Sequence, residues 1–133
     1  MSSNKPIRVA IVEDDAWVRE NLAREIGDTP GFECGGSYAT AEAALTAIPA
    51  RPPEVVVLDI NLPGIDGIEA TRRIREILAG RRLPIIALTA NASTQDRAAC
   101  FSAGMDDFIA KPVRAEQLAA MFEKWLTPSP RRN

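Results

Sequence analysis

Histidine is absent from the 133 residues, and cysteine occurs only twice, at Cys34 and Cys100. Without histidine, the chain cannot form a histidine-dependent catalytic triad or a mixed cysteine–histidine zinc site. The two cysteines are far apart in the sequence and do not have the C-x-x-C spacing of metal or redox motifs. We therefore expect both to be buried, reduced thiols.

Long apolar runs and an excess of basic charge are also missing. No stretch approaches the roughly 18 uninterrupted apolar residues of a membrane span, and residues 1–5 lack the apolar core of a signal peptide. The net charge is -2, whereas a dedicated nucleic-acid-binding domain normally carries a basic excess. We expect a cytoplasmic protein that binds neither nucleic acid nor membranes directly.

The composition is that of an ordinary globular domain, with 46% hydrophobic and 26% charged residues. A chain of this length can bury about two thirds of its unfolded surface without disulfides or metals. We expect one domain over residues 1–133, with a core over about 7–126 and a tail over 127–133. Two arginine clusters are interpreted as a solvated helix face and the segment just after that helix: Arg72, Arg73, Arg75, Arg81 and Arg82.

Strand-like and helix-like segments alternate along the chain. Strands are predicted at residues 7–12, 32–39, 55–59, 84–89 and 108–110, with glycines at 35 and 36 weakening the second. Helices are predicted after 15, over 40–48, from Asp66 to Gly80, from Ser93 to Gly104, and around 118–125. Asp66 should cap its helix by accepting backbone N–H bonds, with the Glu69 side chain reaching back to the helix start. The last helix should bury Leu118, Met121, Phe122 and Trp125. This alternation predicts an α/β domain with a parallel sheet and right-handed crossovers.

The third predicted strand ends in a carboxylate. Four apolar residues, Val55–Leu58, run directly into Asp59, and a Pro-Gly pair follows at 63–64. A short run without alternation is typical of a strand buried on both faces. Asp59 could cap a turn at the strand end, or it could be a nucleophile. The neighbouring strand ends decide between these readings.

Five residues of suitable chemistry lie at the ends of four of the strands: Glu13, Asp14, Asp59, Thr89 and Lys111. In open parallel sheets, ligands bind outside the carboxyl ends of the strands. Three clustered carboxylates repel one another by about 1 to 4 kcal/mol per pair, so a cation is expected among them. Mg²⁺ prefers oxygen ligands, and the backbone carbonyl of Asn61 could supply another oxygen.

This set of groups suits phosphoryl transfer. Aspartate is an established nucleophile for aspartyl-phosphate formation, and Asp59 would attack the phosphorus atom. Lys111 would hold a phosphoryl oxygen by charge, and Thr89 would hold another by a hydroxyl hydrogen bond. Metal binding alone would leave Thr89 and Lys111 unexplained.

At this point the chain resembles a known family over about residues 7–126: the receiver domains of two-component response regulators. The motifs that carry the resemblance are Val12-Glu13-Asp14-Asp15, the segment 58–67 around Asp59, Ala87-Leu88-Thr89-Ala90 and Lys111-Pro112. The sequence of these and neighbouring segments is most similar to that of receivers of hybrid sensor histidine kinases. The resemblance implies a flavodoxin-like fold with strand order 2-1-3-4-5 and helices on both faces of the sheet.

The resemblance also implies roles for individual residues. Asp59 would accept a phosphoryl group from phosphohistidine, with Mg²⁺ held by Glu13, Asp14, Asp59 and Asn61. Thr89 would be the switch hydroxyl, Phe108 the switch aromatic and Lys111 the phosphate-binding lysine, with a cis bond before Pro112. Asn61 and Asn91 would tune the lifetime of the phosphate.

The implied protein is a signalling switch rather than an enzyme that acts on other substrates. Its partner would be a sensor histidine kinase or a histidine phosphotransfer domain, and a homodimer is possible. Trp17 is either an anchor for that partner or a ring lying over its own helix. The sequence leaves open whether the receiver stands alone or belongs to a larger protein.

Two other classes remain open. A phosphohydrolase of the haloacid dehalogenase type also attacks with a strand-end aspartate, but it requires a second acid two residues later, where this chain has Asn61. A receiver-like module could instead bind partners without being phosphorylated. The complete set of acids, together with Thr89 and Lys111, argues against a module that is not phosphorylated.

Overall fold

The computed structural model describes residues 6–80, 83–90, 94–111 and 113–126. Five strands alternate with five helices along the chain: β1 (Ile7–Val12), α1 (Ala16–Gly27), β2 (Phe32–Tyr38), α2 (Ala41–Ala47), β3 (Val55–Asp59), α3 (Gly67–Ile77), β4 (Ile85–Thr89), α4 (Thr94–Ala103), β5 (Asp107–Ala110) and α5 (Ala115–Leu126). Several predictions lie outside the described residues: those for Arg81, Arg82, Asn91, Ser93, the bond before Pro112, and the two ends of the chain.

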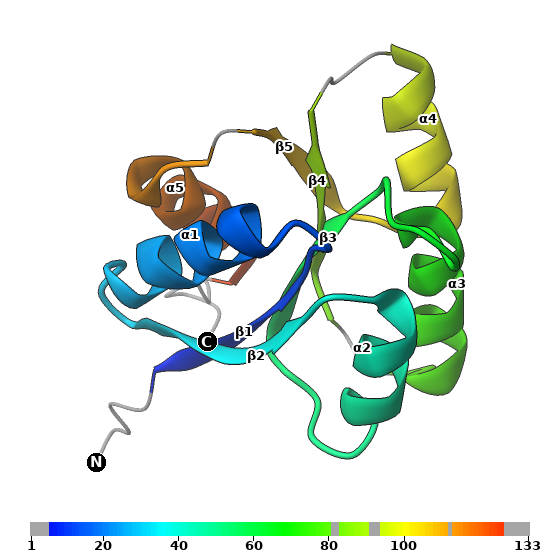
Figure 1. Ribbon diagram of the computed structural model, residues 1–133, viewed down its shortest axis with the longest axis horizontal. Helices are drawn as coiled ribbons and strands as arrows, with labels where there is room; N and C mark the ends of the chain where they lie inside the picture. The colour runs from blue at the N-terminus through cyan, green and yellow to red at the C-terminus, as the bar shows by residue number, and fades with distance from the viewer. Residues whose placement is uncertain (1–5, 81–82, 91–93, 112, 127–133) are drawn as a thin grey trace.

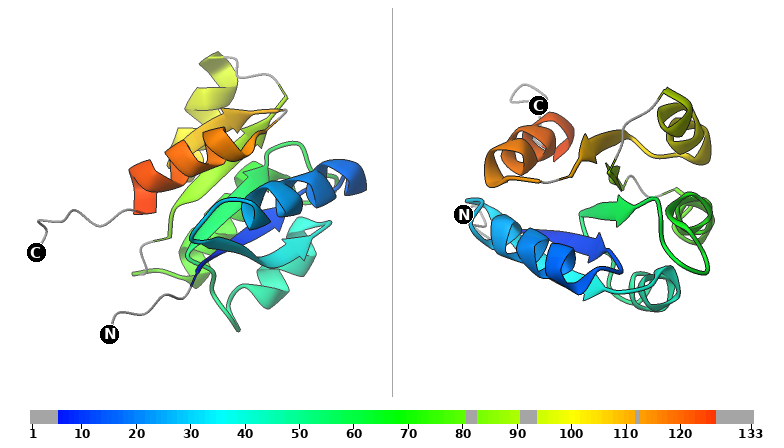
Figure 2. Two further views of the ribbon diagram at one scale, coloured as in Figure 1. Left: turned by 90° about the vertical axis from the view of Figure 1, so that its left-hand side faces the viewer. Right: turned by 45° about the horizontal axis from the view of Figure 1, so that its top comes forward.

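The strands form one parallel sheet in the order β2-β1-β3-β4-β5. Helices α1 and α5 cover one face, and α2, α3 and α4 cover the other (Figures 1 and 2). The predicted α/β class, strand order and two-sided helix cover are confirmed. Among the described residues, no helix combines the length and the hydropathy of a membrane span.

Side chains of the central strands alternate between two hydrophobic clusters, one on each face of the sheet. In β3, Val55 and Val57 pack with α1 and α5, whereas Val56 and Leu58 pack with α2, α3 and α4. Successive side chains of a strand point to opposite faces, so a strand covered on both sides must be apolar at every position. Every residue of β3 is buried, as the sequence predicts.

The last helix packs through the predicted residues. Leu118 and Phe122 are 1% and 0% exposed, and Met121 and Trp125 are partly buried against the same cluster. Phe122 also contacts the ring of Phe32 on β2, with ring centroids 4.7 Å apart. The i, i+3, i+4, i+7 pattern therefore marks a core-facing stripe.

Strand β2 is regular except at its glycines. The register with β1 shifts between Val9, opposite Cys34, and Ala10, opposite Gly36, so Gly35 is left over. One extra residue in one strand is a β-bulge, which glycine accommodates readily. The strand is continuous across the bulge, although the glycines weaken the sequence signal for it.

The prediction of two buried thiols is half correct. Cys100 on α4 is buried, but Cys34 is only partly buried. Cys34 lies on β2, which is an edge strand of the sheet, and an edge strand has fewer neighbours to cover it. Neither cysteine forms a disulfide with another described residue.

The start of α3 is pressed against the end of β3. Asp66 caps the helix by accepting a hydrogen bond from the Glu69 amide at 2.9 Å, as predicted. Gly67 donates its amide hydrogen to the Ile60 carbonyl at 3.2 Å. A Cβ atom at residue 67 would lie 2.6 Å from the Cα of Ile60 and even closer to the carbonyl of Asp59. No side chain fits at this position.

The carboxylate of Glu69 was expected to reach back to the helix start, but it pairs with two arginines instead. It lies 3.5 Å from Arg72 and 3.1 Å from Arg73, one turn further along α3. These two arginines are solvent-exposed, as the interpretation of a solvated face requires. The reciprocal half of the capping box is lost to the i, i+3 and i, i+4 pairs.

The same interpretation is wrong for Arg75. Its guanidinium donates hydrogen bonds to the carbonyls of Leu83 at 2.7 Å and Gly104 at 2.6 Å, and it pairs with Asp106 at 2.9 Å. Asp106 also accepts a hydrogen bond from the Ile85 amide at 2.8 Å. Arg75 therefore ties α3 to the starts of β4 and β5.

Asp107, the first residue of β5, is linked to the end of α5. It accepts hydrogen bonds from the indole nitrogen of Trp125 at 2.9 Å and from Lys124 at 3.0 Å. Burial alone would raise the pKa of Asp107, but these two donors and the Phe108 amide outweigh burial and lower it. The charged form of Asp107 is therefore stabilised by the fold.

Candidate functional site

The carboxyl ends of four strands meet at one edge of the sheet. Val12 pairs with Leu58, so Glu13 follows its strand beside Asp59. Asp59 pairs with Leu88, which places Thr89 next along the edge. The Lys111 amide donates a hydrogen bond to the Thr89 carbonyl at 2.8 Å. We call this group, with Asp14, the carboxyl edge: Glu13, Asp14, Asp59, Thr89 and Lys111.

Three carboxylates converge at this edge. Glu13, Asp14 and Asp59 each offer one oxygen, and these oxygens lie within 4.8 Å of one another. Glu13 and Asp59 are 1% and 3% exposed, whereas Asp14 is exposed to solvent. Two of the three acids are therefore out of water, where like charges repel more strongly.

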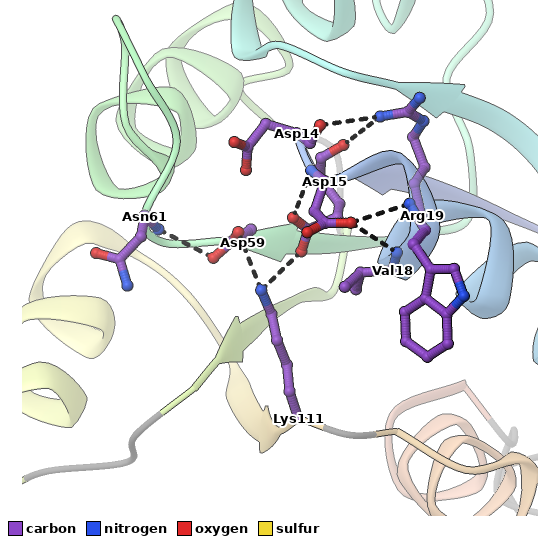
Figure 3. A network of polar contacts seen from close by, with 9 residues as sticks. Asp14, Asp15, Val18, Arg19, Asp59, Asn61 and Lys111 are labelled. Carbon is purple, nitrogen blue, oxygen red and sulfur yellow. Dashed lines mark hydrogen bonds and ion pairs between the residues drawn. The ribbon is translucent and has the colours of Figure 1, made fainter.

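Lys111 points into the carboxylate cluster (Figure 3). Its ammonium nitrogen lies 2.9 Å from Oε1 of Glu13 and 3.3 Å from Oδ2 of Asp59. One ammonium group thus faces two buried carboxylates and a third acid, Asp14, nearby. The cluster carries an excess of negative charge.

The titration behaviour of the cluster follows from this charge. Burial raises the pKa of Glu13; the Asp15 amide and Lys111 oppose the rise without offsetting it, and the charge of Asp59 adds to it. Burial alone would lower the pKa of Lys111, but the contacts with Glu13 and Asp59 outweigh it and raise the pKa. The lysine is held in its charged form.

The cluster suits a hard divalent cation. Oε1 of Glu13 is buried, and among the described residues it has an ion pair with Lys111 but no hydrogen bond of good geometry. All three acids offer oxygen, the ligand that Mg²⁺ prefers. The amide of Asn61 donates to Oδ1 of Asp59 at 3.0 Å, so the peptide backbone of Asn61 lies beside the same carboxylate. These residues fit a magnesium site.

Asp15 caps the helix that follows it and orients the acid Glu13 that precedes it. Its carboxylate accepts hydrogen bonds from the amides of Trp17 at 2.9 Å and Val18 at 3.1 Å, which caps α1. Its own amide donates to Oε2 of Glu13 at 3.0 Å. The third acid of the run Glu13-Asp14-Asp15 is thus a structural residue that orients Glu13.

Arg19 also contacts this loop, and sequence analysis did not single it out. From α1, its guanidinium turns back and donates to the carbonyls of Glu13 at 2.8 Å and Asp14 at 3.4 Å (Figure 3). A cation near a helix start is disfavoured by the helix dipole. An arginine four residues after the Asp15 cap is therefore unusual, but residue type alone does not show which carbonyls it contacts.

Thr89 and Phe108 lie on neighbouring strands, with Thr89 at the end of β4 and Phe108 opposite Ala87 on β5. Thr89 is 4% exposed at the end of β4. Phe108 is partly buried on β5, with its ring against two residues of α4. The Phe101 ring centroid is 6.3 Å away, and the Arg97 guanidinium carbon lies 4.5 Å above the Phe108 ring.

A cavity of about 260 Å³ opens beside the carboxyl edge, between the start of α1 and the connection from β5 to α5. It is lined by Trp17, Val18, Leu22, Ala90, Lys111 and Val113, among others. Trp17 is 73% exposed. The cavity therefore has Lys111 of the site at its lining and a large aromatic side chain in solvent at its rim.

Comparison with known proteins gives one family. The family model described as the response regulator receiver domain matches residues 9–123. The response regulator MprA of Mycobacterium sp. strain KMS is 39% identical over 115 residues, which is 86% of this chain and 48% of the relative. The chain thus spans about half the length of the curated relatives it matches.

Solved structures agree. The receiver domain of the sensor histidine kinase PA1611 from Pseudomonas aeruginosa, with magnesium coordinated in its active site cleft, has a TM-score of 0.80 and 33% identity, covering 90% of this chain and 97% of that one. The CheX-CheY complex with BeF3 and magnesium from Borrelia burgdorferi has a TM-score of 0.80 and 25% identity, covering 90% and 89%.

Proposed function

This chain belongs to the response regulator receiver domain family, and we propose that it is switched by transfer of a phosphoryl group from a phosphohistidine to Asp59. The observation that carries the proposal is the position of Lys111, whose ammonium group lies 3.3 Å from Asp59 within a cluster of three carboxylates. A turn-capping role for Asp59 would not require a partly buried lysine or two further acids.

The residues of the carboxyl edge divide the chemistry among them. Glu13, Asp14, Asp59 and the backbone carbonyl of Asn61 would hold Mg²⁺. When bound, the cation would supply the positive charge that offsets the carboxylates and the incoming phosphoryl oxygens. Support comes from the fit of the oxygen ligands and from the magnesium in the PA1611 receiver domain.

The transfer itself needs a nucleophile and two groups that hold oxygens. A carboxylate oxygen of Asp59 forms a bond to phosphorus while the phosphorus–nitrogen bond of phosphohistidine breaks, leaving an imidazole on the donor. Lys111 binds one phosphoryl oxygen by charge, and the Thr89 hydroxyl donates to another. Because Lys111 already contacts Asp59 before transfer, it has to move only from carboxylate to phosphate.

Phosphorylation would then bias the conformation. The phosphate adds about -1.5 to -2 charge and three acceptor oxygens, which draw Thr89 inward and let Phe108 take the vacated space. Reversing a 1:99 balance takes about 5.5 kcal/mol, which a few charge-assisted hydrogen bonds at about 1.5 to 3 kcal/mol each can supply. In this proposal the chain acts on its own Asp59 rather than on a separate substrate.

The phosphodonor is proposed to be a sensor histidine kinase or a histidine phosphotransfer domain that docks at the cavity beside Lys111. The exposed ring of Trp17 and the apolar Val113 would contact it. Trp17→Ala should slow transfer from the cognate donor by about tenfold without changing phosphorylation by a small molecule. Equal loss with both donors would mean that Trp17 supports the site instead of the partner.

Mass spectrometry tests the main proposal. The chain is incubated with Mg²⁺ and a small acyl phosphate, and the modified residue is mapped; Asp59→Asn is the control. We expect one phosphoryl group on Asp59, none in the variant and none without the metal. An unmodified Asp59 would favour a receiver-like module that binds partners without phosphorylation. Turnover of small phosphate esters would favour a phosphohydrolase.

A further inference from the structure

We infer that Arg19 is a positioning residue for the metal site: its guanidinium fixes the backbone of the Glu13–Asp14 loop so that the Asp14 carboxylate faces the other two acids. This inference rests on the proposed function, because it assigns Arg19 a part in holding Mg²⁺. Arg19 would not itself touch the cation or the phosphoryl group. It acts through two main-chain carbonyls.

The three acids are held in place by different means. Glu13 accepts a hydrogen bond from the Asp15 amide and pairs with Lys111. Asp59 accepts one from the Asn61 amide and also contacts Lys111. The carboxylate of Asp14 is exposed and, among the described residues, makes no hydrogen bond or ion pair (Figure 3). Its direction therefore depends on its backbone.

That backbone is fixed from two sides. The Glu13 amide donates to the carbonyl of Tyr38 at 3.0 Å, which ties the loop to the end of β2. Arg19 donates to two successive carbonyls, that of Glu13 at 2.8 Å and that of Asp14 at 3.4 Å. These carbonyls belong to the peptide units on either side of the Asp14 Cα. Hydrogen bonds from a charged donor are stronger than those from a neutral one, so Arg19 restricts the peptide units on both sides of Asp14.

The charge of Arg19 and its hydrogen bonds predict opposite effects on the affinity for Mg²⁺, which makes the inference testable. A cation near the acids repels Mg²⁺, so removing only the charge would strengthen metal binding, and added salt would screen this effect. Removing a positioning contact weakens metal binding, because the ligand must then be ordered at the moment of binding. Groups that hold metal ligands in place without touching the metal typically contribute about 10- to 100-fold in affinity.

The experiment is calorimetric titration of the full chain with Mg²⁺. Arg19→Met keeps the length and apolar stem of the side chain, and Arg19→Gln is a second variant should the first fold poorly. Arg24→Met is the matched control, because Arg24 is an exposed arginine of the same helix. Circular dichroism and thermal unfolding in the presence of a chelator show whether each variant is folded.

We expect both Arg19 variants to raise the Mg²⁺ dissociation constant about tenfold while they remain folded, and Arg24→Met to leave it within about twofold. A dissociation constant that is unchanged or lower in the Arg19 variants would overturn the inference. If the wild-type chain itself bound no Mg²⁺, the proposed function would fail as well, so the two failures are distinguishable.

Discussion

The two ends of the sheet use charge in opposite ways. At the carboxyl edge, Glu13 and Asp59 are buried beside a third acid that is exposed, and burial raises the pKa of Glu13. At the other end, which we call the amino edge, Arg75 pairs with Asp106 and Asp107 pairs with the end of α5. There the pKa of Asp107 is lowered, because its donors outweigh its burial.

The different balance of charge at the two edges shows where charged groups stabilise the fold and where they destabilise it. At the amino edge, charged groups meet opposite charges or carbonyls, and three segments of the chain are tied together. At the carboxyl edge, negative charge exceeds positive charge, which costs folding free energy but leaves groups ready for a cation and a phosphate. Substitutions at the two edges should therefore separate stability from function.

The largest effect is expected at Asp59. Asp59→Asn should abolish phosphorylation and, without magnesium, stabilise the fold by about 1 kcal/mol, because one of three repelling carboxylates is removed. Urea denaturation in a chelator measures the stability, and phosphate incorporation measures the function. A variant less stable than the wild type would show that Lys111 stabilises Asp59 more than the other acids destabilise it.

At the amino edge, Arg75→Met should destabilise the fold by about 2 kcal/mol. The loss is smaller than for a fully buried pair, because the Arg75 side chain is 27% exposed. Urea denaturation measures it, with Arg72→Met, an exposed arginine of the same helix, as a control expected to cost about 0.5 kcal/mol or less. Phosphorylation of the folded variant should be unchanged, and a slower rate would argue against two independent edges.

A smaller effect is expected at Thr89, where two substitutions separate the hydroxyl from the shape of the side chain. Thr89→Val removes the hydroxyl and should slow phosphorylation by a small acyl phosphate about tenfold, the value of one charge-assisted hydrogen bond. Thr89→Ser keeps the hydroxyl and should stay near the wild-type rate. Rates measured by phosphate incorporation that are equal in the two variants would exclude a hydroxyl contact.

The smallest effect concerns acid stability at Asp107. Its pKa in the folded state is lowered from 3.8, so its contribution to stability is complete above about pH 3.8 and is lost as the pH falls through the folded value. Thermal unfolding below pH 4 should therefore depend less on pH in Asp107→Asn than in the wild type. An identical pH dependence in the wild type and in Asp107→Asn would contradict the prediction.

The fold could be predicted from sequence because its signals are local and repeat along the chain. The apolar run of β3, the cap at Asp66 and the stripe of α5 each indicate their element within a few residues. The five residues of the carboxyl edge could be assembled in the same way, since a parallel sheet brings strand ends together. Their chemical roles are implied by the resemblance and await the experiments above.

Arg75 and Arg19 could not be placed in this way. Arg75 stands in a row of arginines, and only the fold brings the carbonyls of Leu83 and Gly104 to it. Arg19 binds carbonyls rather than charged side chains, and a carbonyl acceptor leaves no mark in a sequence. In both cases backbone carbonyls are among the partners, and every residue carries one, so residue type does not reveal them.

Gly67 limits how a change at the end of β3 can reach the surface. With no space for even a methyl group between residue 67 and the backbone of Asp59 and Ile60, the first turn of α3 cannot move closer to the end of β3. A displacement of the end of β3 toward α3 therefore moves the whole helix. For an engineer who wishes to sense the state of Asp59, a probe far along α3 should report as faithfully as one placed near its start.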